Sequence, residues 1–492
     1  MMPNSGGELD LQALRDSLRR VLPEHCLLLS EEECRPYECD GLTAYRELPL
    51  AVCLPENEKQ IVDVLRTCAH LGVPVVARGA GTGLSGGAMP HAQGVVLSLA
   101  RLNRIIRLDA EARLAVVQPG VRNLAVSEAA APFGLYYAPD PSSQIACTLG
   151  GNVAENSGGV HCLKYGLTVH NVVRARVVTS EGEIIELGGE APDMPGMDLL
   201  ALFIGSEGML GVVTEITVRL TPKPKLAQVV MASFDEVGKA GDAVAAIIAA
   251  GIIPAGLEMM DKAATAAVEP FVQAGYDLKA EAILLCESDG TPEEVADEIS
   301  RVCVVLEKAG ARQIRVSQSE AERLRFWAGR KAAFPAVGRI TPDYYCMDGT
   351  IPRRRLAEML AAIARMERKY GLRCANVFHA GDGNLHPLIM YDAAQPGEWA
   401  RAEEFGAEIL EMSVALGGSI TGEHGVGIEK INQMCVQYAA PELECFHRIK
   451  AAFDEQGLLN PGKAIPSLHR CAEYGRMHVH HGELKFPELE RF

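Results

Sequence analysis

Residues 77–90, ARGAGTGLSGGAMP, decide how the first half of this chain is interpreted. Gly81 to Gly86 fits the pattern G-x-G-x-x-G, and Gly83 to Gly87 fits G-x-S-x-G. Both patterns require a helix directly after the loop. Here Pro90 follows instead, and the apolar VVLSLARL at 95–102 predicts another strand. Both interpretations therefore fail on context.

The loop still predicts a strand–loop–strand unit whose glycines leave backbone N–H groups free to converge on an anion. A purely structural glycine-rich turn is the alternative. Two further segments rich in small residues favour a ligand, namely PDPSSQIACTLGGNVAENSGG at 139–159 and IGSEGMLGVVTEITV at 204–218. Three such segments in one domain suit a long dinucleotide cofactor threaded between two subdomains.

Composition and charge exclude several classes of protein. A chain of 492 residues with 48% apolar residues can bury a large core and usually forms two or three domains. Its net charge of −17 and its 5% aromatic content argue against a nucleic-acid or anionic-membrane surface. We find no signal-peptide pattern at the start and no apolar run long enough to span a membrane. The fourteen cysteines include no C-x-x-C pair, so we expect mostly buried, reduced thiols in a cytoplasmic protein.

The succession of strands and helices predicts an α+β protein with two main domains. Strand and helix patterns alternate up to TPKPKL at 221–226, where prolines two positions apart exclude a helix and a central strand. Beyond this linker the alternation restarts and ends in a hairpin, which indicates an antiparallel sheet covered by helices. We expect an N-terminal helix and a two-subdomain first domain at 1–225, and a cap domain at 226–425. The segment 426–492 carries a last helix and returns to the first domain, with a surface HVHH at 478–481.

The second domain contains a candidate site for a metal ion, for proton transfer, or for both. VFHAGDGNLHPL at 377–388 turns at Gly-Asp-Gly, so His379 and His386 can point the same way across a hairpin. The later TGEHGVG adds Glu423 and His424. Two imidazoles and one carboxylate can hold Zn²⁺ or a similar ion with positions left open. In an extended loop His424 would point away from Glu423 and face a substrate, although the two residues could exchange roles.

These segments together resemble the vanillyl-alcohol-oxidase-type flavoproteins. The glycine loop, the 139–159 segment and GSEGMLGVVTE follow that family's order and spacing. HAGDGNLHP, TGEHGVG and the later NPGK resemble its D-2-hydroxyacid dehydrogenase branch. WAGRKAAFPA, RITPDYYCMDGTIPRRR and the closing RMHVHHGELKFPELERF are most similar to the flavin subunits of bacterial glycolate oxidases. The resemblance covers roughly residues 20–465 and implies a flavin-binding first domain with a substrate-binding cap.

The resemblance implies FAD and, with the small-residue segments, indicates which residues hold it. Relatives that bind flavin covalently carry a histidine in the glycine loop where this chain has Thr82, so we expect non-covalent FAD. The expected FAD-binding residues are Arg78, Gly79, Ala80, Gly81, Thr82, Gly83, Leu84, Pro139, Asp140, Ser142, Thr148, Gly151, Asn152, Asn156, Gly158, Glu207, Gly208, Val213 and Asn460.

The resemblance also implies oxidation of a small 2-hydroxy acid, glycolate or D-lactate, to the 2-oxo acid. A divalent ion, Zn²⁺ or Mn²⁺, held by His379, His386 and Glu423 would lower the pKa of the substrate hydroxyl. His424 would take the hydroxyl proton, and the hydride would pass to flavin N5.

The substrate carboxylate would bind a cationic side chain. An arginine is best suited, because its guanidinium can bind a carboxylate through two hydrogen bonds. RLRFWAGRKAAF offers Arg325, Arg330 and Lys331, and the resemblance favours Arg330. Relatives that act on a longer diacid carry a lysine where this chain has Cys346. We therefore expect a small substrate.

The chain shows no second redox centre and no NAD fingerprint, so the electrons should leave to a partner or to quinone and not to NAD. The resemblance implies a second flavin-type subunit and an iron–sulfur subunit, which would hold the chain peripherally at the inner membrane. One alternative is a D-lactate or other D-2-hydroxyacid dehydrogenase that acts without partner subunits. A metallohydrolase would leave the glycine-rich first domain unexplained, and a non-catalytic flavin scaffold would need none of the histidines.

Overall fold

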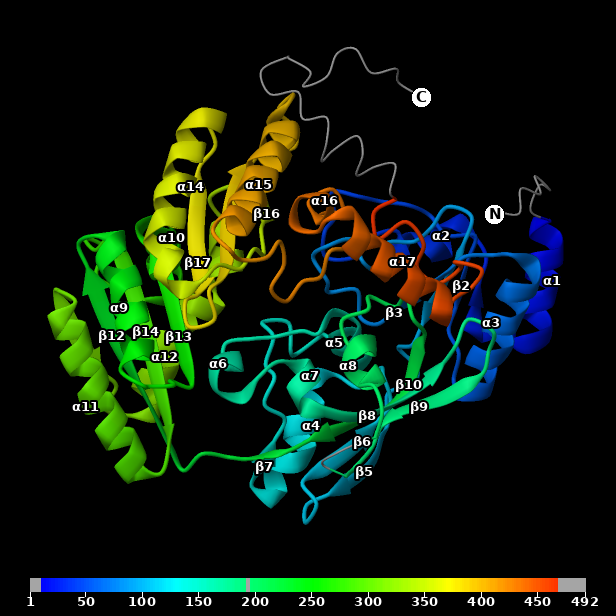
Figure 1. Ribbon diagram of the computed structural model, residues 1–492, viewed down its shortest axis with the longest axis horizontal. Coiled ribbons are helices and arrows are strands. Elements are labelled where there is room, and N and C mark those ends of the chain that lie inside the picture. The colour runs from blue at the N-terminus through cyan, green and yellow to red at the C-terminus, as the bar shows by residue number, and fades with distance from the viewer. Residues whose placement is uncertain (1–9, 192–194, 468–492) are drawn as a thin grey trace.

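The computed structural model, which describes residues 10–191 and 195–467, contains two main sheets in the first half of the chain and one large sheet in the second (Figure 1). The predicted combination of a two-subdomain flavin domain and a cap with an antiparallel sheet is confirmed. The segment RMHVHHGELKFPELERF, with its HVHH, lies outside the described residues.

The first sheet supports the glycine loop. Its strands run in the order β1 (Leu27–Leu28), β2 (Ala51–Cys53), β4 (Val95–Ser98) and β3 (Val75–Arg78), of which β2, β4 and β3 are parallel. The helix after β2 is α3 (Glu58–Leu71), which begins at an Asn57 N-cap and ends at Gly72 with a φ of +65°. The glycine loop follows β3 directly, so the strand ends where the ligand is expected. The remaining helices of this subdomain are α1 (Leu11–Val21), η1 (Glu24–Cys26), α2 (Glu31–Cys34) and η2 (Arg35–Tyr37).

The second sheet is antiparallel and carries the other two small-residue segments. Its order is β5 (Ile105–Asp109), β6 (Leu114–Val117), β10 (Val212–Arg219), β8 (Val172–Val178) and β9 (Ile184–Gly188). β8 and β9 form a hairpin, and Gly182 takes a φ of +75° in its turn. The helices of this subdomain are α4 (Asn123–Ala130), η3 (Ala131–Phe133), α5 (Leu149–Glu155), α6 (Cys162–Tyr165), α7 (Thr168–Asn171) and α8 (Leu199–Phe203).

The linker between the two domains is short and partly paired. Thr221 and Pro222 form β11, which pairs only with β7 (Leu135–Tyr136) in a two-stranded sheet. This position is compatible with proline, because an edge strand does not need every backbone donor. Leu226 then begins the first strand of the cap.

The cap is built on one antiparallel sheet of seven strands. The order is β15 (Gln313–Val316), β12 (Leu226–Phe234), β14 (Ala282–Gly290), β13 (Gly256–Asp261), β17 (Cys374–His379), β18 (Asn384–Tyr391) and β16 (Asp343–Cys346). The predicted histidine hairpin is β17–β18. It lies near one end of the sheet order, next to β13.

Helices cover both faces of the cap sheet, which explains the mixed apolar pattern of its strands. Along β14, Leu284 and Cys286 join one core and Ile283 and Leu285 join the other, because alternate side chains point to opposite faces. The first core contains α9 (Val237–Ala249), α11 (Pro292–Lys308), α14 (Leu356–Tyr370) and α15 (Glu398–Ala415). The second contains α10 (Lys262–Val272), α12 (Glu320–Lys331) and α13 (Ala333–Val337).

The segment after the cap packs on the first domain. Leu459 forms a parallel bridge with Val75 at the start of β3, and Ile449 and Phe453 pack against the core of the second sheet. These last two residues belong to α17 (Ala440–Phe453), which follows α16 (Met434–Gln437). In Figure 1 both helices lie beside the flavin domain, and Met434 of α16 and Leu443 of α17 also join the first core of the cap.

Within the described part of the chain, no helix has the length and apolar character needed to cross a membrane. Among the residues that the structure describes, twelve cysteines are free thiols, and most of them are buried, in line with the expectation of core thiols. Cys435, by contrast, is disulfide-bonded.

Candidate active site

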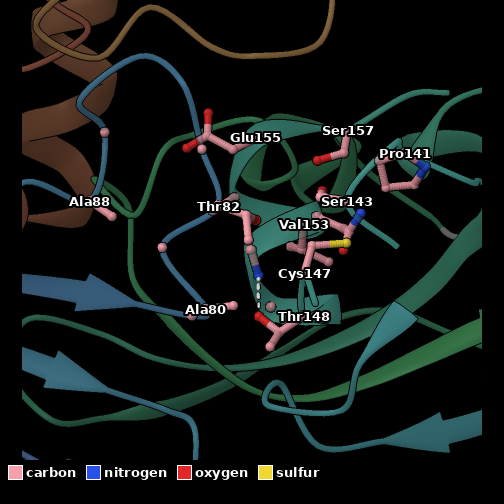
Figure 2. Close-up of a pocket in the computed structure, with 18 of the residues that line it drawn as sticks. Ala80, Thr82, Ala88, Pro141, Ser143, Cys147, Thr148, Val153, Glu155 and Ser157 are labelled. Atoms are coloured by element: carbon pink, nitrogen blue, oxygen red, sulfur yellow. Dashed lines mark hydrogen bonds between the residues drawn. The ribbon is translucent and has the colours of Figure 1, made fainter. Parts of the chain in front are cut away.

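A cavity of about 400 Å³ lies between the flavin domain and the cap. The flavin domain contributes the glycine loop, residues of the 139–159 segment and residues of the 204–218 segment. Figure 2 shows small side chains from these segments gathered around the cavity, among them Thr82, Ser143 and Ser157. The cap contributes Lys331, Phe334, Pro335, His386, Glu423 and His424. The cavity therefore joins the cofactor segments to the histidine cluster.

Two glycines of the loop have distinct spatial roles. A Cβ atom on Gly79 would lie 2.3 Å from Thr148 Oγ1, so only glycine allows the loop to approach this residue. Thr148 in turn caps α5, since its Oγ1 accepts a hydrogen bond from the Gly151 amide at 3.4 Å (Figure 2). A Cβ atom on Gly83 would meet nothing closer than 3.8 Å, and Gly83 lines the cavity. A larger side chain at Gly83 would thus fill space without disturbing the loop.

Most of the residues predicted to bind FAD line the cavity. They are Arg78, Gly79, Ala80, Gly81, Thr82, Gly83, Leu84, Ser142, Thr148, Gly151, Asn152, Glu207, Gly208 and Val213.

Five of the residues predicted to bind FAD do not line the cavity. They contact residues around it instead. The Pro139 carbonyl accepts a hydrogen bond from Asn123, and Asp140 pairs with His161 Nδ1 at 2.7 Å. Asn156 ends α5 with a φ of +53° and accepts the Val169 amide. Gly158 gives room to Glu423, because its Cβ would lie 2.6 Å from Glu423 Oε2. The Asn460 amide donates to the carbonyls of Gly87 and Glu207.

Sequence reasoning missed several residues that line the same cavity. Their signal was present, because all of them except Phe203, which directly precedes the 204–218 segment, lie inside the small-residue segments. The missed residues of the flavin domain include Gly87, Ala88, Ser143, Cys147, Val153, Glu155, Ser157 and Phe203.

The hairpin brings the two histidines together as its register requires. His379 pairs with Asn384 across the strands, and His386 pairs with Val377, two residues before His379. The two imidazoles therefore lie diagonally on one face of the sheet, with ring centroids 5.0 Å apart. Both side chains are 3% exposed.

Glu423 reaches this pair from a distant loop. Its Oε1 lies 3.3 Å from His379 Nε2 and 3.4 Å from His386 Nε2. Ligand atoms of the three residues lie within 4.8 Å of one another. This arrangement converges on one point, as a divalent ion would require.

Asp348 organises the Glu423 loop and was missed from the sequence. Its buried carboxylate accepts the amides of Gly422, Glu423 and His424 at 2.9–3.3 Å. Because three successive amides converge on one carboxylate, the loop curls and its side chains do not alternate. The expectation that His424 points away from Glu423 is therefore wrong. The His424 ring instead stacks on His386 at 4.9 Å, and its Nε2 lies 3.9 Å from Glu423 Oε1.

Arg330 lies in the interior and not on the cavity wall. Its Nε donates to Glu258 Oε2 at 2.6 Å, and its Nη2 lies 3.5 Å from His379 Nδ1. The neighbouring Lys331 lines the cavity and is exposed. Arg325, the third candidate for the substrate carboxylate, lies 53% exposed beside Glu322.

Charge in the cluster is shared between carboxylates and imidazoles. Burial acts to raise the pKa of Glu423, but His379, His386 and His424 outweigh it and lower that pKa to about 2. Burial acts to lower the pKa of His379, yet Glu258 and Glu423 raise it to about 10. Burial lowers the pKa of His424 below its usual range. The neighbouring carboxylates thus favour a positive charge at His379, and an ion bound there would take the place of the proton on its Nε2.

Buried polar atoms without partners fit both expected groups. His386 Nε2 faces Glu423 and has no hydrogen bond among the described residues, as expected of a nitrogen that ligates an ion. Asn152 is 1% exposed and lines the cavity, yet neither atom of its side-chain amide has a partner. A bound cofactor with polar edges would satisfy this amide. The residues present therefore suit FAD in the cavity and an ion at its cap end.

Comparison with known families assigns both halves of the chain. Residues 49–188 match the model of the FAD binding domain, and residues 223–464 match that of FAD linked oxidases, C-terminal domain. The first match ends before the linker, and the second begins within it at residue 223. The first domain is therefore an FAD-binding domain, and the enzyme is an FAD-linked oxidoreductase.

Several curated proteins are similar over nearly the whole chain. Glycolate oxidase subunit GlcD of Escherichia coli K12 is 63% identical over 485 residues, which cover 99% of this chain and 97% of that protein. The subunit of the same name from Bacillus subtilis is 40% identical over 87% of this chain and 91% of that protein. A D-lactate dehydrogenase of Anaerostipes hadrus is 31% identical over 92% of this chain and 97% of that protein.

Solved structures show the same fold at low identity. p-Cresol methylhydroxylase with substrate bound superposes with a TM-score of 0.80 at 18% identity, covering 95% of this chain and 99% of that chain. The 4-ethylphenol oxidase of Gulosibacter chungangensis superposes with a TM-score of 0.79 at 18% identity, covering 95% and 100%. The chain belongs to the FAD-linked oxidases of the vanillyl-alcohol-oxidase type.

Proposed function

We propose that this protein oxidises a small 2-hydroxy acid, glycolate or D-lactate, to the 2-oxo acid with non-covalent FAD and a divalent ion. The observation that carries the proposal is the convergence of His379, His386 and Glu423 at one end of the FAD cavity. The 63% identity to a glycolate oxidase subunit supports the substrate class. Thr82 stands where a covalent flavin link would need a histidine, which supports FAD that is bound non-covalently.

The metal-binding residues are His379, His386 and Glu423. The low pKa of Glu423 keeps its carboxylate available as a ligand. The ion, Zn²⁺ or Mn²⁺, would polarise the hydroxyl of a chelated 2-hydroxy acid. The turn at Gly381–Gly383 keeps the two histidines on one hairpin, and Asp348 keeps the Glu423 loop curled against them.

His424 is the proposed base. Neither of its ring nitrogens makes a hydrogen bond to another described residue, so one nitrogen is available for the hydroxyl proton. Stacking on His386 holds the imidazole beside the metal ligands. Burial disfavours the protonated ring, which suits a group that starts the reaction neutral.

Arg330 is the proposed partner of the substrate carboxylate. Arg330 is not among the residues that line the cavity, but its Nη2 lies 3.5 Å from His379 Nδ1, beside the proposed ion. Glu258 engages Nε, and Nη1 has no hydrogen bond among the described residues. Lys331 would contribute a weaker, solvent-exposed charge at the cavity mouth. FAD, when bound, supplies the two-electron acceptor for the substrate hydride.

The electrons are proposed to leave to a partner protein or to quinone and not to NAD. Relatives named as subunits support an assembly with partner proteins. The partners proposed are a second flavin-type subunit and an iron–sulfur subunit. Such partners would place the chain in the cytoplasm, peripherally at the inner membrane. The second candidate function is a D-2-hydroxyacid dehydrogenase that acts without partners, which the similar D-lactate dehydrogenases favour.

The test is anaerobic reduction of the purified flavoprotein by glycolate and by D-lactate, followed by its absorption spectrum. We expect bleaching of the flavin, rapid reduction of artificial dyes, slow reduction of oxygen and no reduction of NAD. Prior dialysis against a chelator should abolish bleaching, and Zn²⁺ or Mn²⁺ should restore it. Rapid NAD reduction by the isolated chain, or bleaching that ignores chelation, contradicts the proposal. Full activity without any co-purifying partner favours the second candidate.

A further inference from the structure

We propose that Glu258 is a positioning residue that sets the orientation of both His379 and Arg330 through one buried carboxylate. The inference rests on the proposed function, in which His379 binds the ion and Arg330 binds the substrate. Glu258 itself does not line the cavity and contacts neither reacting partner.

The geometry links one carboxylate to two groups with different tasks. Glu258 Oε1 lies 2.7 Å from His379 Nδ1, and Glu258 Oε2 lies 2.6 Å from Arg330 Nε. The three side chains are between 1% and 3% exposed, so water does not compete for these bonds. Both oxygens of the carboxylate are thus engaged.

The fold brings Glu258 to this position. Met259 on β13 pairs with Phe378 on β17, and the same register continued by one residue sets Glu258 across from His379. Glu258 points to the face of the sheet that α12 covers, where Arg330 lies near the end of the helix. The Glu258 carboxylate is therefore enclosed between His379 on the neighbouring strand β17 and Arg330 on α12.

On the histidine side, the bond selects the ring nitrogen that carries hydrogen. A carboxylate only accepts, so His379 Nδ1 must be the donor and Nε2 is left to face Glu423. Such a partner fixes the tautomer and the ring orientation of a metal-binding histidine. Because Nδ1 donates to Glu258, its 3.5 Å separation from Arg330 Nη2 is a close approach of two donors.

On the arginine side, the bond fixes the direction of the guanidinium. With Nε held by Glu258, the terminal nitrogens of Arg330 extend beyond Glu258 toward His379. An unpaired guanidinium at 2% exposure would be strongly disfavoured. The same carboxylate therefore stabilises the buried cation and directs the part of it that remains to bind an anion.

Glu287 on the adjacent strand β14 is a natural control. It lies on the same face of the sheet, is 2% exposed, and holds the same helix by accepting from Arg323 Nη1 at 2.7 Å and from Trp327 Nε1. It contacts neither His379 nor Arg330. Glu287 also lies 3.3 Å from His161 Nε2, and His161 in turn pairs with Asp140 of the flavin domain. Loss of either glutamate weakens the attachment of α12, but only Glu258 connects that attachment to His379 and Arg330.

The experiment compares the substitutions Glu258→Gln and Glu287→Gln in the full FAD-loaded chain. The readouts are Zn²⁺ and Mn²⁺ affinity by chelator competition, KM and kcat for glycolate, FAD content and melting temperature. A glutamine has one acceptor oxygen and one donor group, so it satisfies only one of the two donors. We expect Glu258→Gln to weaken metal binding by about 10- to 100-fold and to raise KM. We expect Glu287→Gln to lower the melting temperature without either effect.

Wild-type metal affinity and KM in Glu258→Gln would overturn the inference, as would equal changes in Glu287→Gln. Should Glu258→Gln fail to fold, Glu258→Asp keeps the charge but withdraws it by one methylene, and the same two shifts are expected. Arg330→Lys should raise KM and leave metal affinity unchanged. A wild-type protein that holds no divalent ion and ignores chelators would instead overturn the proposed function, and with it the metal half of this inference.

Discussion

The two walls of the cavity are built on different principles. The flavin wall consists of short contiguous stretches, in which glycines and small residues present backbone to the ligand. The cap wall is assembled from side chains on α12, α13, β18 and the loop after α15, and buried carboxylates on β13 and after β16 hold the residues of the histidine cluster behind it. The first wall depends on the absence of side chains and the second on their exact identity. Single substitutions should therefore damage the two walls in different ways.

The largest expected effect is on the cap wall, at the proposed base. His424→Ala should lower the rate of flavin reduction by about 10²–10⁴-fold, the usual contribution of a general base. Metal and FAD content should remain, because His379, His386 and Glu423 still converge without it. Stopped-flow reduction and metal analysis check this result. Loss of the ion in this variant would show that His424 and Glu423 exchange roles.

The second-largest effect is expected at Glu423, the carboxylate proposed to bind the metal ion. Glu423→Gln removes the carboxylate that lies within 3.4 Å of both histidines. Metal affinity should fall by more than the roughly 10- to 100-fold that loss of an outer partner costs. FAD content should stay near that of the wild type, since no residue of the flavin wall changes. A variant that retains its ion would place the ion elsewhere.

The flavin wall should respond to added volume. Gly83→Leu introduces a side chain into open cavity space, where the nearest atom to its Cβ is 3.8 Å away. We expect soluble, folded and nearly colourless protein that still binds the divalent ion. Gly72→Ala, at a helix end with nothing within 4 Å, serves as a control for a general glycine effect. Full flavin content in Gly83→Leu would mean that FAD does not occupy this part of the cavity.

A smaller effect is expected where the substrate carboxylate binds. Arg330→Lys should raise KM by about 10- to 100-fold, which corresponds to one lost charge-assisted hydrogen bond of about 1.5–3 kcal/mol. Steady-state kinetics with glycolate and D-lactate measure it. An unchanged KM would remove Arg330 from the site and leave Lys331 as the cationic candidate.

The smallest effect should come from the exposed neighbour. Lys331→Ala should raise KM by no more than about fivefold, because an exposed charge contributes at most about 1 kcal/mol. Arg325→Ala, which is outside the cavity, should leave KM unchanged within error. A larger loss from Lys331→Ala than from Arg330→Lys would reverse the assignment.

Much of the fold was predictable because its signals are local. The Asn57 cap and Gly72 stop enclose α3, the turn at Gly182 marks the β8–β9 hairpin, and the prolines of 221–226 mark the domain junction. The cavity segments were likewise recognisable, since runs of glycine and other small residues are unusual outside ligand loops. Within those runs sequence alone could not separate residues that face the cavity, such as Ser157, from residues that support it, such as Asn156.

The sequence by itself determined which chemical groups are available: a glycine-rich cofactor loop, two histidines on one hairpin and a Glu-His pair between glycines. Only the tertiary structure decided how they are directed. Asp348 curls the Glu423 loop by binding three successive amides, and Glu258 joins His379 to Arg330 from a strand more than 100 residues before the histidine. Local patterns carry backbone geometry, but the partner of a buried charge is chosen by packing across sheets and helices. Such partners become visible only when distant strands lie side by side.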